Sequence, residues 1–103
     1  MKINIDGSVE KFIQNLDSHT IAKTFRTIDL LEKFRNQLGM PHSKKVTSNL
    51  FELRIRGKQE IRIFYCFYNN CICLIYGFIK KSQKTPKKEL QNAENKYKLL
   101  DTI

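Results

Sequence analysis

The stretch Leu50-Phe51-Glu52-Leu53-Arg54-Ile55-Arg56 alternates between apolar and charged side chains from Phe51 onward. Successive side chains of a β-strand point to opposite faces of a sheet, so this pattern predicts a strand with one buried face. The apolar side chains at positions 51, 53 and 55 lie on one face, and the charged side chains at 52, 54 and 56 lie on the other. A β-sheet therefore begins here, in the second half of the chain.

Two further strands are predicted to follow this one. Residues 57–59 form a turn that leads into a second strand over residues 60–68. Asn69 and Asn70 turn the chain again, because asparagine tolerates the positive φ that two-residue hairpin loops require. A third strand then runs from residue 71 to about 79. Both later strands are apolar on both faces, as expected for central strands that are covered on two sides. The three strands form an antiparallel meander.

Before this sheet the apolar residues follow the 3.6-residue period of amphipathic helices. Ser8 is expected to cap a first helix that extends to Leu16, and Asp17-Ser18 offers the cap of a second, longer helix. The second helix closes at Leu38-Gly39, since Pro41 cannot continue it. Its predicted apolar stripe consists of Ile21, Phe25, Ile28, Leu31 and Phe34.

A third helix and a short strand complete the expected chain. Thr85 is expected to cap the last helix, with Pro86 in its first turn. The apolar stripe of this helix is Leu90, Ala93, Tyr97 and Leu100, and Ile3 and Ile5 form a short edge strand near the N-terminus. The order (β)ααβββα predicts a single α+β domain over residues 1–103. It is a small antiparallel β-meander with an N-terminal helical hairpin and a C-terminal helix, packed on a face of the sheet.

Positive charge is concentrated in the half of the chain that forms the sheet. The 103 residues carry 19 Lys and Arg against 10 Asp and Glu, a net charge of +9. Residues 1–43 hold six basic and five acidic side chains, whereas residues 44–103 hold thirteen basic and five acidic ones. This excess excludes an acidic mimic of a partner and indicates a polyanionic partner.

The remaining features of the sequence indicate in which compartment the protein acts and whether it binds a cofactor. No run of residues approaches the length of a membrane span, and the first residues lack the apolar segment of a secretion signal. Cys66, Cys71 and Cys73 form an odd set, which is typical of reduced thiols in the cytoplasm. No second ligand pair stands at zinc-finger spacing from them, so we expect no metal and no cofactor. We interpret all three as small apolar residues within a strand pair.

Loop lengths predict which residues face each other across the sheet. A three-residue loop at 57–59 places Arg54 opposite Arg62. A two-residue loop at 69–70 places Cys66 opposite Cys73, and Arg62 opposite Gly77. Directly opposed like charges destabilise a sheet by up to about 1 kcal/mol, so a fold retains such a pair most readily where an anion binds between them. Gly77 is expected to leave an open floor beside Arg62 for that ligand.

Lysines surround the two arginines in the expected fold. Strand alternation places Lys81 on the face of Arg62, and loops on both sides of the meander supply a basic rim. The arginine fork suits bidentate contact with phosphate, while lysine acts as a mobile point charge. We therefore predict that Arg62, Arg54 and Lys81 hold a nucleic-acid phosphate. The surrounding candidates for phosphate contact are Arg56, Lys44, Lys45, Lys80, Lys84, Lys87 and Lys88.

Aromatic residues and His42 leave alternatives open. The rings of the second and third strands either stack on nucleic-acid bases or belong to the core, and the core is favoured for each of them. They are Phe64, Tyr65, Tyr68 and Tyr76. His42 is either a proton carrier or, as we favour, a hydrogen-bonded loop histidine. The arginine face carries only Glu52 and Glu60 as carboxylates, so the sequence does not assign the general acid and base.

Several segments taken together resemble a known family of bacterial toxins. They are residues 50–56, Arg62-Ile63-Phe64-Tyr65, residues 77–86 (GFIKKSQKTP) and Leu38-Gly39-Met40-Pro41. This combination is similar to the RelE/HigB-type toxins of type II toxin–antitoxin pairs, within the RelE/ParE superfamily. The closest branch is the phage-derived one, and the resemblance extends from about residue 9 to residue 100.

The resemblance implies a RelE-like fold and a ribosome-dependent mRNA endoribonuclease, or mRNA interferase, that a cognate antitoxin protein neutralises. In that reaction the ribose 2′-OH attacks the scissile phosphate, and no metal is required. Arg62 matches the family's strand arginine, which implies that it stabilises the transition state. Arg54 and Arg56 would grip the same phosphate or its neighbours. The implied candidates for acid, base or ribosomal RNA contact are Lys81, Lys84, Lys44 and Lys45, whereas Tyr97 is read as core.

Two other functions stay open. The same fold serves ParE-like toxins, which poison gyrase without nuclease chemistry, and a basic sheet face also suits a non-catalytic RNA-binding module. Arg54, Arg62 and Lys81 on one face favour the nuclease over the gyrase poison. The charges do not separate the nuclease from the binding module, because gripping a phosphate and cleaving it require the same residues.

Overall fold

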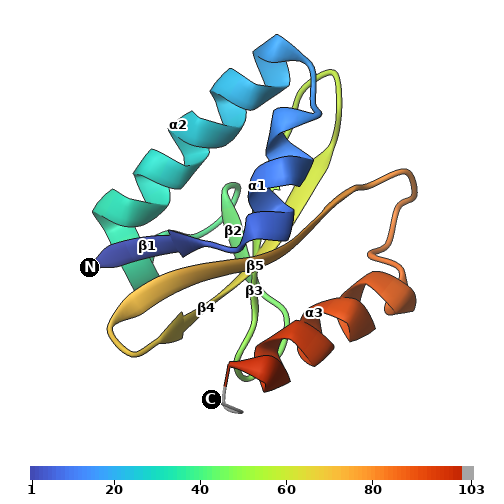
Figure 1. Cartoon of the computed structure of the whole chain (residues 1–103). Coiled ribbons are helices and arrows are strands. Elements are labelled where there is room, and N and C mark those ends of the chain that lie inside the picture. Colours follow the sequence, from blue (N-terminus) through green and yellow to red (C-terminus); the bar gives the residue numbers. More distant parts are fainter. Residues whose placement is uncertain (101–103) are drawn as a thin grey trace.

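The computed structural model describes residues 1–100 as one sheet with helices on both of its faces (Figure 1). The elements in chain order are β1 (Lys2–Ile5), α1 (Gly7–Gln14), α2 (Ser18–Phe34), the 3-10 helix η1 (Arg35–Gln37), β2 (Ser43–Lys45), β3 (Phe51–Ile55), β4 (Ile61–Tyr68), β5 (Cys71–Ile79) and α3 (Lys87–Leu99). No helix within this part of the chain is long and apolar enough to cross a lipid bilayer. The predicted α+β class is confirmed.

The sheet has five strands in the order β1-β5-β4-β3-β2. Its centre is the predicted antiparallel meander of β3, β4 and β5. The predicted edge strand β1 pairs with β5 in parallel, so the sheet is mixed. At the other edge β2 pairs antiparallel with β3, where the sequence indicated only a loop. Three residues are too few for a recognisable alternation, which is why the sequence did not show this strand.

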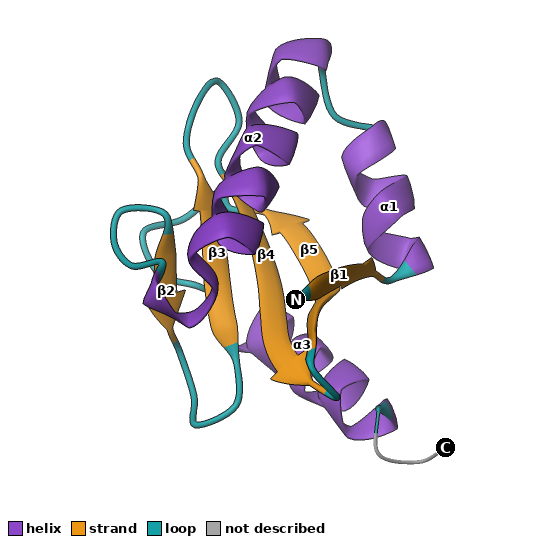
Figure 2. Ribbon diagram, turned by 90° about the vertical axis from the view of Figure 1, so that its left-hand side faces the viewer, coloured by secondary structure: helices purple, strands orange, loops and turns teal. Residues whose placement is uncertain are grey.

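Helices cover both faces of the sheet, as the two-sided apolar pattern of β4 and β5 requires (Figure 2). One core lies under α1 and α2 and includes Val9, Ile13, Ile28, Leu31, Leu53 and Ile63. The other lies under α3 and includes Leu50, Phe64, Cys66, Ile75, Phe78 and Ala93. The expectation that all helices pack on one face was therefore wrong for α3. Its predicted stripe does face the core, since Leu90, Tyr97 and Leu100 pack beside Ala93.

The helix caps differ from the predicted ones at two of three positions. Asp6, not Ser8, caps α1, and its carboxylate accepts a hydrogen bond from the backbone N–H of Ser8 at 3.0 Å. Asp17 caps α2 as predicted, through the backbone N–H of Thr20 at 2.9 Å. Thr85 does not cap α3, because its hydroxyl is used elsewhere, and the helix begins after Pro86.

The buried stripe of α2 is made of threonines as much as of apolar residues. Phe25 and Phe34 were predicted to be core, yet they are 43% and 45% exposed. Thr20, Thr24 and Thr27 are buried in their place. The hydroxyl of Thr24 donates to the carbonyl of Thr20 at 2.8 Å, and that of Thr27 donates to the carbonyl of Lys23 at 2.9 Å. Because these hydroxyls are satisfied within the helix, their burial costs little.

A β-bulge in β5 changes the register that loop lengths predict. Cys66 faces Cys73 and Arg54 faces Arg62, as expected. Between these two positions the register shifts, since Tyr65 pairs with Leu74 but Phe64 pairs with Tyr76. One extra residue in β5 moves every later side chain to the opposite face.

Arg62 therefore faces Phe78, and Gly77 pairs with Ile63 on the other side of the sheet. The expected open floor beside Arg62 was wrong. Gly77 lies instead under the ring of Phe12 from α1, and a Cβ atom built at Gly77 would lie 2.7 Å from the Cδ2 atom of that ring. The glycine is required so that α1 can approach β5 closely.

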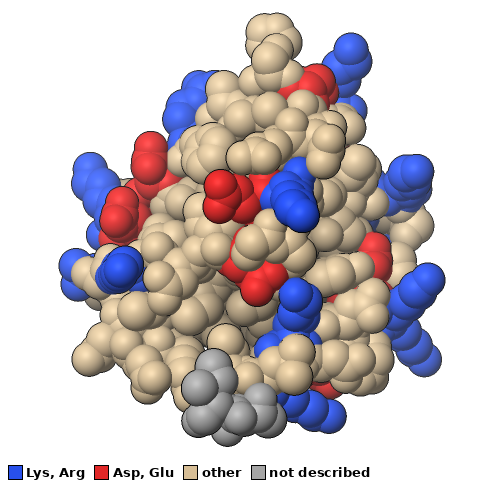
Figure 3. Space-filling model, in the orientation of Figure 1, with Lys and Arg blue, Asp and Glu red and all other residues tan. Residues whose placement is uncertain are grey.

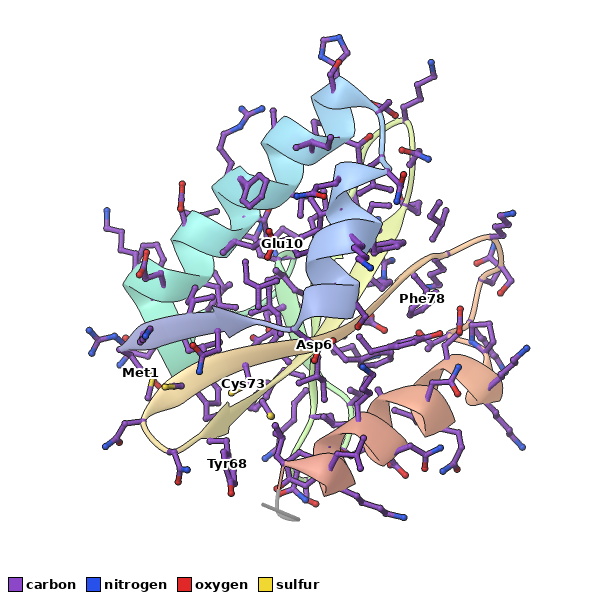
Figure 4. The ribbon with its side chains drawn as sticks, viewed as in Figure 1. Met1, Asp6, Glu10, Tyr68, Cys73 and Phe78 are labelled. Atoms are coloured by element: carbon purple, nitrogen blue, oxygen red, sulfur yellow. The ribbon has the colours of Figure 1, made fainter. Side chains whose placement is uncertain are left out.

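A salt bridge joins the two helical layers around the sheet. The ammonium of Lys96 in α3 lies 3.2 Å from the carboxylate of Asp6 at the start of α1. Figure 4 labels Asp6 at this junction, where β1 passes into α1. Burial raises the pKa of Asp6, but its hydrogen bonds to Ser8 and Lys96 outweigh that effect, and the pKa lies below its usual value. The pair links segments 90 residues apart in the chain.

The cysteines occupy strand positions, as predicted, and all three are free thiols. Cys66 and Cys73 are buried and lie opposite each other, while Cys71 is partly exposed. Figure 4 labels Cys73 on β5. Burial raises the pKa of Cys66 to about 12, and it also raises the pKa of Cys73. Both thiols are therefore protonated at neutral pH, and protonated thiols are poor nucleophiles.

Substitution of Gly77 by alanine should lower the free energy of unfolding by about 1–3 kcal/mol, because the added methyl group overpacks against Phe12. Urea denaturation measures this change. Gly39→Ala is the matched control, since no atom lies within 4 Å of its added Cβ. The double variant with Phe12→Leu should recover part of the loss. Equal urea midpoints for Gly77→Ala and Gly39→Ala would contradict the close contact.

Alkylation at pH 8 should modify Cys71 in the native protein and leave Cys66 and Cys73 intact, since their raised pKa values keep them protonated and burial shields them. Mass spectrometry of the iodoacetamide-treated protein measures this. In 8 M urea all three thiols should react. Rapid native alkylation of Cys66 would show that the strand pair opens readily.

Candidate functional site

A buried carboxylate holds the two opposed arginines. Glu52 is 3% exposed, and its Oε1 atom lies 3.3 Å from Nε of Arg62 and 3.6 Å from Nε of Arg54. The geometry follows from the sheet. Glu52 and Arg54 are two residues apart on β3 and share a face, and the register of β3 with β4 brings Arg62 beside them. One negative charge thus offsets the repulsion between two positive ones.

The second carboxylate oxygen of Glu52 fixes the loop after β5. The hydroxyl of Thr85 donates to Oε2 of Glu52 at 2.9 Å. This bond explains why Thr85 is not available to cap α3. It ties the segment between β5 and α3 to β3, next to the two arginines.

Arg62 is also held by Glu60 at the start of β4. Its Nη1 atom donates to Oε2 of Glu60 at 3.1 Å and to the carbonyl of Ile61 at 3.2 Å. The side chain of Arg62 is 2% exposed, whereas that of Glu60 is 39% exposed. The arginine is therefore rigid and mostly enclosed, while its second carboxylate partner lies at the surface.

Both arginines keep unused hydrogen-bonding capacity. The Nε atoms of Arg54 and Arg62 are buried and make no hydrogen bond, although each lies within 4 Å of Glu52. The contacts with Glu52 thus offset the positive charge of the two guanidinium groups, but they leave both Nε–H donors without a hydrogen bond. An unsatisfied buried donor costs about 1–3 kcal/mol, so this arrangement of the two arginines lowers the stability of the sheet.

These residues line a cavity of about 630 Å³ that is rich in positive charge. Five of its side chains are cationic and one is acidic. The lining residues are Arg54, Arg56, Glu60, Arg62, Lys80, Lys81, Ser82 and Gln83. Burial lowers the pKa of Lys80, and the nearby charge of Arg62 adds to that effect. Burial, followed by the charges of Arg62 and Arg56, likewise lowers the pKa of Arg54. The cavity therefore has a strongly positive potential and suits an anion.

A family model described as "Phage derived protein Gp49-like (DUF891)" matches residues 11–98. The chain belongs to this family. The match confirms the phage-derived branch expected from the motifs, and it spans every residue that lines the cavity. No curated protein matches the chain.

The Gp49-like fold brings together five of the predicted phosphate ligands. Arg54, Arg56, Arg62, Lys80 and Lys81 all line the cavity. The bulge changes which of the two lysines lies beside Arg62. The backbone N–H of Lys80 donates to the carbonyl of Glu60 at 2.7 Å, so Lys80 continues the strand register beside Arg62. Strand alternation had predicted that place for Lys81, which is exposed at the cavity mouth.

The other predicted basic residues lie outside the cavity. Lys44 and Lys45 are exposed on the edge strand β2, and Lys45 approaches the ring of Phe51 at 5.9 Å. The exposed lysines that follow β5 and begin α3 are Lys84, Lys87 and Lys88. Figure 3 shows basic side chains along the margin of the molecule near this segment, while acidic side chains lie near the centre of the same face. In this Gp49-like protein, Lys84, Lys87 and Lys88 form a basic rim outside the cavity that contains Arg62.

The aromatic side chains are used in the core, as favoured from the sequence. Phe64 and Tyr65 are buried. The Tyr76 hydroxyl donates to Glu89 at 2.7 Å and accepts from Asn92 at 3.1 Å, which anchors α3 to β5. The backbone carbonyl of His42 accepts from the N–H of Arg54 at 2.8 Å. Among residues 1–100 no group of three or more His, Cys, Asp and Glu side chains is placed to hold a metal ion.

Sequence reasoning missed the roles of Glu52 and Thr85. The spacing of Glu52 and Arg54 on one strand was a usable signal, because residues two apart on a strand share a face. Nothing in the sequence indicated that Thr85 bonds to a residue 33 positions earlier. Ser82 and Gln83 also line the cavity without having been predicted.

Replacing Glu52 by glutamine should destabilise the protein by about 3 kcal/mol, because it leaves the buried guanidinium of Arg62 and the partly buried one of Arg54 with one partially exposed carboxylate. Urea denaturation measures the loss. Glu32→Gln, at an exposed position on α2, is the control and should change stability little. If Glu52→Gln unfolds at the same urea concentration as the unmodified protein, the buried carboxylate does not hold the arginines together.

Proposed function

We propose that this protein is the toxin of a type II toxin–antitoxin pair and that it cleaves mRNA on the ribosome. The observation that carries the proposal is the pair of opposed arginines, held by a buried carboxylate in a cavity with three further cationic side chains. Membership of the Gp49-like family and the toxin-like motifs of the sequence support it. We also propose that it acts in the cytoplasm, where its reduced thiols and its substrate are found.

The cavity supplies what phosphate cleavage by a neighbouring hydroxyl needs. The ribose O2′ forms a bond to phosphorus, the P–O5′ bond breaks, and the products are a 2′,3′-cyclic phosphate and a 5′-hydroxyl. The 2′-OH loses its proton to a base, and the leaving O5′ gains one from an acid. The phosphate acquires extra negative charge in the transition state, and fixed positive donors stabilise that charge.

Arg62 is assigned to transition-state stabilisation in this proposal. It is rigid, nearly enclosed and held from two sides, so it needs no reorganisation when charge develops. Arg54 lies beside it and binds the same phosphate, and Arg56 grips a flanking one. Because Glu60 is the exposed partner of Arg62, an incoming phosphate shares or replaces that contact while Glu52 keeps the guanidinium in place.

Proton transfer is assigned to the amines at the cavity wall. An ordinary lysine, with a pKa near 10.4, is a poor base at neutral pH. Burial and the charge of Arg62 lower the pKa of Lys80, which moves this side chain toward the range useful for catalysis. Lys81 at the mouth is the second amine, and among residues 1–100 Glu60 is the one carboxylate that lines the cavity.

The basic rim has a separate role. The exposed side chains of Lys84, Lys87 and Lys88 lie outside the cavity, and we assign them, with Lys44 and Lys45, to ribosomal RNA. Such contacts position the enzyme and depend strongly on salt. We further propose that the cognate antitoxin covers this basic surface. Its contacts would compete with RNA for the same charges.

Arg62→Ala should abolish cleavage of mRNA, with a rate loss of about 100-fold or more, because the transition state loses its main fixed donor. Expression in bacteria followed by mapping of mRNA 5′ ends measures this, and cuts are expected within translated reading frames. Lys33→Ala on α2, outside the cavity, is the control.

Because Arg62 is buried, its replacement can also unfold the protein. A second variant at an exposed position therefore separates loss of catalysis from loss of the fold. Lys81→Gln lies at the exposed mouth and should keep the fold, with its urea midpoint unchanged, while cleavage falls at least tenfold. Growth arrest with intact mRNA would favour a ParE-like action on gyrase. RNA binding without arrest and without cuts would favour a non-catalytic RNA-binding module.

A further inference from the structure

A second cavity, of about 280 Å³, lies between α2 and the end of β3. It is separate from the cavity that contains Arg62, and the proposed cleavage chemistry does not use it. The residues that line it are Lys23, Arg26, Thr27, Leu30, Pro41, His42, Arg54, Ile55 and Arg56. None of these lining residues is acidic.

The cavity exists because β3 extends past its neighbour at the edge of the sheet. β2 pairs with β3 only from Phe51 to Leu53. The next contact is the backbone N–H of Arg54, which donates to the carbonyl of His42 at 2.8 Å. Beyond it α2 approaches the strand end, where the ammonium of Lys23 donates to the carbonyl of Arg56 at 3.1 Å. The gap between the helix and the strand end is therefore open to solvent at the sheet margin.

The cavity beside α2 has apolar residues on its inner surface and cationic residues at its rim. Leu30, Pro41 and Ile55 supply apolar surface. Lys23 and Arg26 on α2 are exposed at the surface. A nucleotide has the same division, with an aromatic base that prefers apolar or guanidinium surfaces and a phosphate that prefers cations.

The two cavities share a wall. Arg54 and Arg56 line both of them. Arg54 reaches from Glu52 in one direction to the sulfur of Met40 in the other, with Nη1 3.4 Å from that sulfur. The two arginines therefore connect the cavity that contains Arg62 with the cavity beside α2. This continuity favours RNA over an unrelated anion.

We propose that the cavity between α2 and β3 is a nucleotide-binding subsite, which takes a base and phosphate next to the cleaved phosphate of single-stranded RNA. The inference rests on the proposed RNA cleavage and adds a source of sequence preference to it. Arg26 contacts the flanking phosphate or stacks on the base, and Leu30 forms the apolar floor.

The test compares Arg26→Ala and Leu30→Phe with Lys33→Ala, which removes a charge from the same helix outside both cavities. Binding to a short single-stranded RNA is measured by fluorescence anisotropy at several salt concentrations. The RNA carries 2′-O-methyl groups so that it cannot be cleaved. Arg26→Ala should weaken binding about tenfold and reduce the slope of log Kd against log salt by about one, and Lys33→Ala should change neither value.

The cleavage sites give an independent readout. Leu30→Phe narrows the cavity, so the set of cut sequences mapped from mRNA 5′ ends should change while cleavage continues. If both variants match Lys33→Ala in affinity, salt slope and cut sequences while the unmodified protein still cleaves, the subsite is wrong and the proposed function stands. If the unmodified protein does not cleave mRNA, the proposed function fails. Loss of poly-glutamate binding in Arg26→Ala, with RNA binding unchanged, would assign the cavity to an acidic protein segment instead.

Discussion

The ion pairing of Glu52 with Arg54 and Arg62 is the constraint on which the rest of the site depends. Two guanidinium groups opposite each other on adjacent strands repel, and one buried carboxylate between them makes the arrangement stable. The same carboxylate binds Thr85 and so fixes the segment that carries Lys80 and Lys81. A single side chain thus positions cationic groups from β3, β4 and the segment that follows β5. The charge of the cavity is a property of the sheet core as much as of its surface.

The β-bulge in β5 connects this site to the opposite face of the sheet. One extra residue places Gly77 under Phe12 of α1 and aligns Lys80 with Arg62. Without it, strand alternation would point Gly77 toward the arginines and Lys80 away from them. The approach of α1 to the sheet and the composition of the cavity are therefore consequences of one irregularity. Bulges next to functional sites commonly redirect side chains in this way.

The parts of the fold that follow from local rules were predictable, and the parts that depend on distant contacts were not. Turn lengths determined the pairing of Arg54 with Arg62 because the intervening loop is short and regular. The bulge could not be predicted from the sequence. Leu74, Ile75 and Tyr76 can pack against the core on either face of the sheet, so both registers fit the apolar pattern. A helical stripe was visible in α2, but periodicity alone favoured Phe25 over Thr24, whose burial depends on a hydroxyl bonded within the helix. Charge composition predicted a cationic site, whereas the buried position of Glu52 required the three-dimensional structure.

The short edge strand β2 has a consequence for how copies of this protein behave together. An exposed strand edge offers unpaired backbone groups to a neighbouring chain, and long flat edges promote aggregation. Here the edge is three residues long, and two of them, Lys44 and Lys45, are exposed lysines. A second molecule that added its own strand at this edge would bring like charges together and gain few hydrogen bonds. The lysines at this margin therefore protect the sheet from self-association.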